Sequence, residues 1–222
     1  MASRRVIFFD VGNTLLFPNR ERILAPLPAD RHPTLEQWHG FQRQIKNEFD
    51  QAMLKGSVDH GFWHGFYSRM LKDLGAEASD GICDALVQNT QNSANWDQIL
   101  PGTRESLERI RTGYRMAVIS NADGRIDAVL RRCGIADCFE TITDSGIVGH
   151  EKPHPAIFEA ALRSMQAQPA ESLYVGDVYS VDYVGARNAG MDAVLFDVPG
   201  AYRGRGLPRV ESMNGLEDWL AQ

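Results

Sequence analysis

Three aspartates stand at or shortly after apolar runs that have the composition of buried strands. Asp10 follows the run Val6–Phe9, and Asp177 and Asp182 follow a second run at residues 173–175. An aspartate on a rigid support can act as a nucleophile and form an aspartyl-phosphate. Carboxylate oxygens are also the hard donors that Mg²⁺ prefers. These residues therefore predict Mg²⁺-dependent phosphoryl transfer with Asp10 as the nucleophile.

Hydrogen-bond donors and a cation complete the predicted site. Ser120 and Asn121 follow a third apolar run at 115–119, and Lys152 lies further along the chain. The Ser120 hydroxyl is suited to bind a phosphate oxygen, and Asn121 is suited to contact substrate. Lys152 offers a compact positive charge to the nucleophile and the transferring group. A loose phosphoryl-transfer transition state needs mainly positioning and charge neutralisation, and this set offers both.

The apolar runs alternate with amphipathic segments of helical period, which is typical of β-α-β units. The carboxyl ends of parallel strands share one edge of a sheet, where ligands bind. We therefore predict an α/β fold built on a doubly wound parallel sheet, with the site at that edge. The predicted helices of this part lie at 101–110, 125–132, 155–165, 181–189 and 216–220, and the predicted strands at 6–9, 115–119, 139–143, 173–175 and 193–196.

A helical insert interrupts the alternation early in the chain. Apolar residues recur at helical spacing over 34–54, 59–74 and 80–91, and no strand is predicted between Phe17 and about Asn95. We expect a core of residues 1–17 and 95–222 and a helical cap of residues 18–94. Two stretches, 17–33 and 199–208, are rich in proline or glycine and predict irregular structure.

Composition narrows the possible partners. The chain has 222 residues and a formal net charge of -6. Nucleic acid and anionic membranes attract basic faces, so neither is expected as the main partner. The start of the chain has no apolar signal segment, and Cys83, Cys133 and Cys138 lack metal-ligand spacing, so we expect a cytoplasmic protein with reduced thiols. A small phosphorylated metabolite fits these limits, while the oligomeric state is left open.

The motifs together resemble the haloacid dehalogenase-like hydrolase superfamily, and specifically its subfamily IA type with a helical C1 cap inserted after the first motif. The resemblance rests on FFDVGNTLL, AVISNADGR, GHEKPHPAIFEAAL and LYVGDVYSVDYVGARNAGM, in that order. It implies that Asp10 is the nucleophile and that Ser120 and Lys152 bind the phosphoryl group. It also implies a Mg²⁺ site formed by Asp10, the carbonyl of Gly12, Asp177 and, through water, Asp182.

Gly12 departs from that family's phosphatases, which usually carry an acid/base aspartate two residues after the nucleophile. General acid–base catalysis accelerates reactions by roughly 10²–10⁴-fold, so loss of this aspartate should lower the rate of hydrolysis. Three alternatives follow. The chain is a phosphatase that takes its acid from elsewhere, a relative of the phosphonoacetaldehyde hydrolases, or a weakly active member that serves as a ligand-binding or protein-binding module. Dehalogenase-like activity is less favoured, because those enzymes need no Mg²⁺ and Asp177 and Asp182 are both present.

Several cap residues are secondary candidates. His60 and His64 could supply the missing acid, and Lys46, Lys55 and Lys72 could form a Schiff base with a carbonyl substrate. Packing or solvent exposure explains each of them equally well. The identity of the substrate is not predicted, because it depends on cap geometry.

Overall fold

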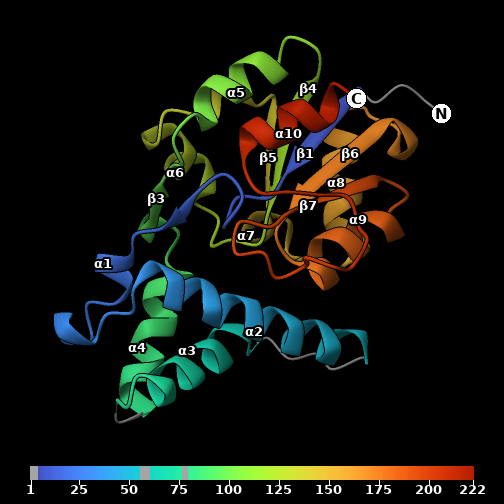
Figure 1. Cartoon of the computed structure of the whole chain (residues 1–222). Coiled ribbons are helices and arrows are strands. Elements are labelled where there is room, and N and C mark those ends of the chain that lie inside the picture. Colours follow the sequence, from blue (N-terminus) through green and yellow to red (C-terminus); the bar gives the residue numbers. More distant parts are fainter. Residues whose placement is uncertain (1–4, 56–60, 77–79) are drawn as a thin grey trace.

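The computed structural model describes residues 5–55, 61–76 and 80–222. It contains a large parallel sheet flanked by helices and a group of helices set apart from it (Figure 1). The strands are β1 (Val6–Phe9), β2 (Phe17–Pro18), β3 (Trp96–Gln98), β4 (Arg115–Ser120), β5 (Thr141–Asp144), β6 (Ser172–Gly176), β7 (Asp192–Phe196) and β8 (Arg209–Val210). The α-helices are α1 (Arg20–Ile23), α2 (Leu35–Leu54), α3 (Phe62–Asp73), α4 (Asp80–Gln91), α5 (Thr103–Ile110), α6 (Ile126–Arg132), α7 (Ser145–Val148), α8 (Pro155–Ser164), α9 (Val184–Asn188) and α10 (Met213–Leu220).

The six-stranded sheet has the order β5-β4-β1-β6-β7-β8, and all its pairings are parallel. β1 lies between β4 and β6, with Phe9 opposite Val118 on one side and Val175 on the other. The strand order reverses beside β1, which is the switch point where α/β proteins bind ligands. The predicted doubly wound α/β fold is confirmed.

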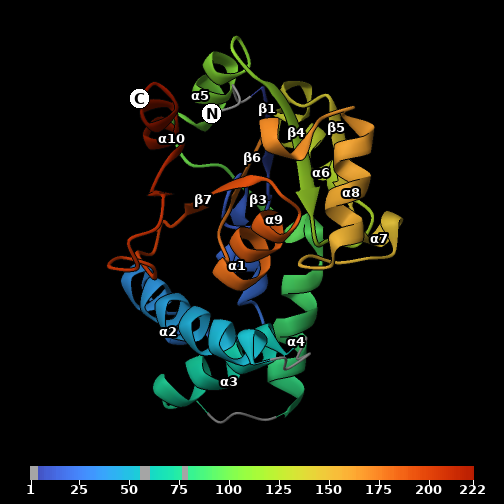
Figure 2. The ribbon, with the colours of Figure 1, turned by 90° about the vertical axis from the view of Figure 1, so that its right-hand side faces the viewer.

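Burial on both faces explains why β1 is an uninterrupted apolar run. Side chains alternate between the faces of a strand, so Ile7 and Phe9 join one hydrophobic cluster and Val6 and Phe8 another. Helices α5, α6 and α10 cover the first face, and α8 and α9 cover the second (Figure 2). The strand that ends in Asp10 is therefore held rigidly from both sides.

Helices α1 to α4, which we call the helical insert, lie beyond the carboxyl edge of the sheet (Figures 1 and 2). α2 begins with a capping box in which Thr34 and Gln37 exchange side-chain and backbone hydrogen bonds. The insert has its own hydrophobic cluster, which includes Trp38, Phe66 and Leu86. α2 and α4 match the predicted segments, and α3 starts at Phe62; the predicted earlier start falls on residues outside the described ranges.

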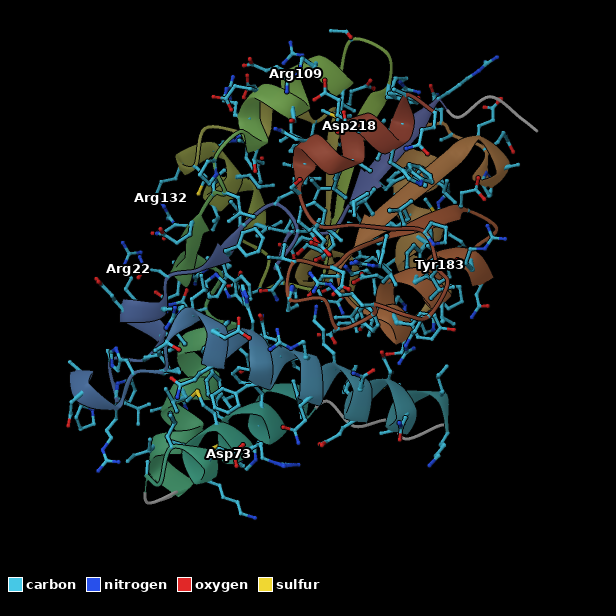
Figure 3. The ribbon with its side chains drawn as sticks, in the orientation of Figure 1. Arg22, Asp73, Arg109, Arg132, Tyr183 and Asp218 are labelled. Atoms are coloured by element: carbon cyan, nitrogen blue, oxygen red, sulfur yellow. The ribbon has the colours of Figure 1, made fainter. Side chains whose placement is uncertain are left out.

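Two short strands join the insert to the sheet, where the sequence predicted none. β2 and β3 pair antiparallel, so the chain leaves and re-enters the core through adjacent strands. Arg22 of α1 and Arg132 of α6 both donate hydrogen bonds to the carbonyl oxygen of Ala94, just before β3. Figure 3 shows these two arginines on the same side of the molecule.

Other differences from the predicted elements are local. Residues Tyr179–Tyr183 form a π-helix before α9, where an ordinary helix was predicted from 181. β8 follows the irregular stretch at 199–208 and was not predicted. The three cysteines carry free thiols, as expected. Within the described ranges, every helix falls short of the length and apolar character needed to span a membrane.

Candidate active site

Three predicted site aspartates meet at the carboxyl edge of β1 and β6. Asp10 directly follows β1, and its backbone N–H donates to the carbonyl of Val175 in β6 at 2.8 Å. Asp177 directly follows β6, and Asp182 returns to the same place from the π-helix. The three carboxylates are buried, and each offers an oxygen within 4.8 Å of the others. Adjacent parallel strands thus bring together residues that lie far apart in the sequence.

Lys152 lies among these carboxylates as predicted. Its Nζ donates to Asp10 Oδ1 at 2.6 Å and to Asp182 Oδ1 at 2.8 Å. The third ammonium contact is the hydroxyl of Tyr174, also at 2.8 Å. The side chain is almost fully buried, so these hydrogen bonds replace its lost hydration.

Tyr174 is a site residue that the sequence analysis missed. It lies inside β6, and its hydroxyl accepts from Lys152 and donates to Asp182 Oδ1 at 3.0 Å. A tyrosine within an apolar strand is expected to be a core residue. The ring of Tyr174 does pack against that of Phe158, with 5.5 Å between the ring centroids. The alternation of side chains in β6 placed it on the face opposite Leu173 and Val175, but its polar role depends on Lys152, which is distant in sequence.

Burial and neighbouring charges perturb the site's acid–base equilibria. Burial raises the pKa of Asp10 to about 7, with Lys152 opposing the rise and the carboxylates of Asp182 and Asp177 adding to it. Burial also raises the pKa of Asp177, against the opposing effect of Lys46. For Lys152, burial lowers the pKa, but the carboxylates of Asp10 and Asp182 outweigh it and raise the pKa overall. The aspartates therefore crowd one another, and a cation would relieve that repulsion.

The loop after Asp10 forms a tight turn. The N–H groups of Leu15 and Leu16 both donate to the carbonyl of Val11, and the Thr14 hydroxyl lies 3.4 Å from Asp10 Oδ2. Asn13 takes the left-handed conformation, with φ 54°, whereas Gly12 lies outside that region. Gly12 is therefore not required at its position by a positive φ.

An indole covers the side of Gly12 where a side chain would project. A Cβ built on Gly12 would lie 3.4 Å from Trp96 Cζ3 and 3.7 Å from Cη2, which is ordinary van der Waals contact. Trp96 is buried in β3, and its Nε1 donates to the carbonyl of Thr90 at 2.7 Å. The position of the family's usual acid/base aspartate thus faces an aromatic ring held in place by a hydrogen bond.

Ser120 and Asn121 reach the same sheet edge by different means. Ser120 is the last residue of β4, next to β1, and it is buried. Asn121 donates from Nδ2 to the carbonyl of Lys152 at 3.0 Å and accepts from the Lys152 N–H at 2.7 Å. This pair of hydrogen bonds fixes the backbone of Lys152 and leaves one N–H group and one lone pair of the Asn121 amide for another partner.

Lys46 of α2, one of the three candidate cap lysines, also enters the site. Its Nζ donates to Asp177 Oδ2 at 2.6 Å and to the carbonyl oxygen of Asp177 at 2.8 Å. Only 1% of the residue is exposed. The interpretation of Lys46 as a surface charge is therefore wrong, because α2 inserts it between the helical insert and the sheet.

Lys46 belongs to a polar stripe that α2 presents to the sheet. One turn before it, Gln42 donates to Asn13 Oδ1 at 3.2 Å, and one turn after it, Asp50 Oδ1 accepts from the N–H of Ser180 at 2.9 Å. Residues four apart lie on one helix face, so all three point the same way. We call Gln42, Lys46 and Asp50 the α2 polar stripe.

Two further aspartates at strand ends have structural partners instead. Asp144, at the end of β5, accepts from the N–H groups of Gly124, Ile126 and Gly146. Asp197, after β7, accepts from the N–H groups of Ala201 and Tyr202 and from Arg209. A strand-end position alone therefore does not identify a catalytic aspartate.

The remaining cap candidates point elsewhere or lie outside the described residues. His64 is exposed, and its ring contacts Ser68 and Asp84 within the helical insert. Lys55 and Lys72 are exposed. His60 lies in a segment that the structure does not describe.

The donor set fits a hard divalent cation. All three grouped side chains are carboxylates, and the described residues leave Asp177 Oδ1 without a hydrogen bond that would compete for it. Oxygen donors of this kind suit Mg²⁺ rather than a soft metal.

The family model of haloacid dehalogenase-like hydrolases matches residues 4–190. The chain belongs to this family. A glyceraldehyde 3-phosphate phosphatase of Methanothermobacter thermautotrophicus is 42% identical over 86% of this chain and 84% of that protein. The human haloacid dehalogenase-like hydrolase domain-containing protein 3 is 32% identical over 89% of this chain and 83% of that protein. The chain is thus a hydrolase of the haloacid dehalogenase-like family with phosphatases among its relatives.

Solved structures agree on the fold. A putative haloacid dehalogenase-like hydrolase of Bacillus subtilis, solved with bound magnesium, superposes with a TM-score of 0.72 at 19% identity and covers 99% of this chain and 100% of that one. A phosphatase of the same family from Thermococcus onnurineus gives a TM-score of 0.62 at 23% identity, with 97% of each chain covered.

Proposed function

We propose that this protein is a Mg²⁺-dependent phosphatase that hydrolyses a small phosphorylated metabolite through an aspartyl-phosphate on Asp10. The observation that carries the proposal is the buried group of Asp10, Asp177 and Asp182 around Lys152, at the switch point of a parallel sheet. The phosphatase names among the relatives support the same reaction class.

Each residue has a proposed task. Asp10 attacks phosphorus through one oxygen as the bond from phosphorus to the substrate oxygen breaks and the alcohol leaves, and water then hydrolyses the aspartyl-phosphate to release phosphate and regenerate Asp10. Lys152 holds Oδ1, which orients the carboxylate and offsets negative charge on the transferring group. Ser120, on the adjoining strand, donates its hydroxyl to a phosphoryl oxygen. Asp10, Asp177 and the Gly12 carbonyl would hold Mg²⁺, with Asp182 supporting it through water. When bound, Mg²⁺ would supply positive charge at the transferring phosphoryl group.

The helical insert is the proposed cap, which shields the reaction from water and selects the substrate. Its α2 polar stripe already contacts the sheet edge beside the nucleophile. Substrates with a phosphate on a short carbon chain, such as glyceraldehyde 3-phosphate, are the first to test, because relatives of this chain carry that name.

Substitution of the nucleophile tests the proposal. Purified protein and its Asp10→Asn variant would be assayed for phosphate release from a panel of phosphorylated metabolites, with Mg²⁺ and with chelator. We expect Mg²⁺-dependent release by the wild type and less than a few per cent of it by the variant, since an amide is not a nucleophile here. Activity retained by Asp10→Asn, or full activity in chelator, contradicts the proposal.

Lys46 favours a second candidate, a phosphonoacetaldehyde hydrolase-like reaction. Enzymes of that kind use a cap lysine to form a Schiff base with a carbonyl substrate, and Lys46 is a cap lysine that reaches the acidic site. Borohydride reduction in the presence of phosphonoacetaldehyde would attach the substrate to Lys46 if this candidate is correct. Absence of a mass increase, with phosphatase activity present, would eliminate it.

A further inference from the structure

The ion pair between Lys46 and Asp177 joins the helical insert to a proposed metal ligand. The ammonium contacts two oxygens of one residue, the carboxylate Oδ2 and the main-chain carbonyl. On its other side lies the ring of Tyr202, with Nζ 5.9 Å from the centroid. Lys46 is therefore enclosed, and Asp177 is the anion that neutralises it.

We infer that Lys46, held at Oδ2, and a divalent cation at Oδ1 compete for the one negative charge of Asp177, so that closure of the helical insert and metal binding oppose each other. This inference rests on the proposed Mg²⁺ site. It assigns Lys46 a place that the family's motifs do not specify, because the residue comes from the insert and not from the sheet.

The charges explain the competition. With all groups ionised, the three carboxylates and the two ammonium groups of Lys46 and Lys152 leave one net negative charge in a buried site. A divalent cation would change this to one net positive charge. Like charges repel strongly where water is excluded, and a buried ammonium whose counter-ion is taken becomes costly to keep. Movement of α2 away from the sheet, which returns the Lys46 ammonium to water, costs less free energy than keeping that ammonium buried without its counter-ion.

The rest of the interface is suited to such a release. Besides Lys46, the contacts from α2 to the sheet side are hydrogen bonds and a longer ion pair. Arg43 donates to the carbonyl of Pro199, Arg205 donates to Asn47, and Arg205 lies 3.7 Å from Asp50. Polar contacts of this type can exchange with water, so separation costs less than the opening of an apolar interface. A dianionic substrate would then restore the negative charge that attracts Lys46 back.

Calorimetric titration with Mg²⁺, in the absence of substrate, tests the inference without measuring turnover. Lys46→Met removes the competing charge and keeps an unbranched side chain that is one atom shorter. We expect the variant to bind Mg²⁺ at least tenfold more tightly than the wild type, which is about 1.4 kcal/mol. Lys72→Met, which removes an exposed lysine of the same insert, should match the wild type within twofold.

Two further measurements guard against misfolding of Lys46→Met. Gln42→Ala weakens closure without a change of charge, and it should strengthen Mg²⁺ binding by a smaller factor, because coupling between closure and metal is reciprocal. The radius of gyration of the wild type, from solution X-ray scattering, should increase when Mg²⁺ replaces chelator.

The outcomes separate this inference from the proposed function. Equal or weaker Mg²⁺ binding by Lys46→Met, or a radius of gyration unchanged by Mg²⁺, overturns the inference and leaves the phosphatase proposal standing. If neither the wild type nor the variant binds Mg²⁺, the metal-dependent function and the inference both fail. Tighter binding by Lys46→Met in a protein that lacks phosphatase activity supports the inference and contradicts the proposed phosphatase function.

Discussion

Asp10 is buried among groups of both signs, and this decides how its carboxyl group titrates. Burial and the two neighbouring aspartates favour the neutral form, whereas Lys152 favours the charged form. A nucleophilic carboxylate must be deprotonated. Without a metal, the charged form of Asp10 is favoured by Lys152 and disfavoured by burial and by repulsion from the other two carboxylates. This balance gives the residue a measurable effect on stability.

The metal-free protein should lose stability as pH rises from about 4 to about 7. The pKa of Asp10 is raised from 3.8 to about 7 in the folded state, so the folded protein binds more protons than the unfolded chain across this window. Asp10→Asn removes the share of that dependence that comes from Asp10, and the difference in melting temperature between variant and wild type should therefore grow from pH 5 to pH 8. Thermal unfolding in chelator at several pH values measures it. A difference that is constant with pH would contradict the raised pKa.

Substitution of Gly12 tests whether the reaction lacks an acid that protonates the leaving group. Gly12→Asp introduces a carboxyl group where the family usually has its acid, and the space is limited by Trp96 at 3.4 Å from the new Cβ. We expect hydrolysis of alkyl phosphates to rise by roughly tenfold or more relative to aryl phosphates, because only poor leaving groups need protonation.

Gly12→Ala is the matched control, since it fills the same space without an acid. If both variants change alkyl and aryl rates in parallel, the effect is steric and the protonation argument is wrong. Melting temperature and Mg²⁺ affinity of both variants show first whether the loop tolerates a side chain.

At the scale of elements, the apolar pattern of α2 predicted the helix but not its polar interface with the sheet. The helix was predicted with nearly these bounds from the spacing of its apolar residues, Leu35, Trp38, Phe41, Ile45, Phe49 and Met53. In the structure Leu35 is 58% exposed, and the most buried face consists of Trp38 and the α2 polar stripe. Periodicity detects the apolar contact with α3, but a second, polar interface leaves no hydrophobic signal. The spacing of Gln42, Lys46 and Asp50 at four residues was the available clue.

The strands were predictable for a physical reason, and the short ones were not. β1 and β4 are buried on both faces, so they appear as continuous apolar runs. β8 has two residues, Arg209 and Val210, and two residues carry no period. Asp10, Asp177 and Asp182 were found because they stand at or shortly after such runs, and Lys152 was found through the motif GHEKPHPAIFEAAL. Tyr174 and Lys46 acquire their contacts in the site only through tertiary structure.

Asp144 is expected to hold together two loops and a helix start. Its carboxylate accepts three backbone N–H groups, from Gly124, Ile126 and Gly146, and it is buried. Asp144→Ala leaves these donors unpaired, and the free energy of unfolding should fall by about 2–4 kcal/mol. Urea denaturation measures the loss, and Asp127→Ala, on the exposed face of α6, should have little effect. Equal losses in the two variants would refute the role given to Asp144.

At the scale of the whole molecule, the acidic group links ligand binding to global stability. Three carboxylates share a buried site with two lysines, and a bound cation would stabilise only the folded protein. Mg²⁺ at about 100 times its dissociation constant should therefore add about 2.7 kcal/mol to the free energy of unfolding. Thermal unfolding with and without Mg²⁺ measures this gain, and Asp177→Asn should abolish most of it. A stabilisation that persists in Asp177→Asn would place the cation elsewhere.

The strand order has a consequence for how the chain acquires its structure during synthesis. β1 is translated before the helical insert, and its partners β4 and β6 are both translated after it. Closure of a long loop costs conformational entropy before the new pairing repays it, so β1 is expected to dock late. Pairing of β2 with β3 shortens that loop by bringing the ends of the insert together. The segment that carries the nucleophile would thus wait as an unpaired apolar strand, and pulsed hydrogen exchange should show its amides gaining protection after those of β4 and β5.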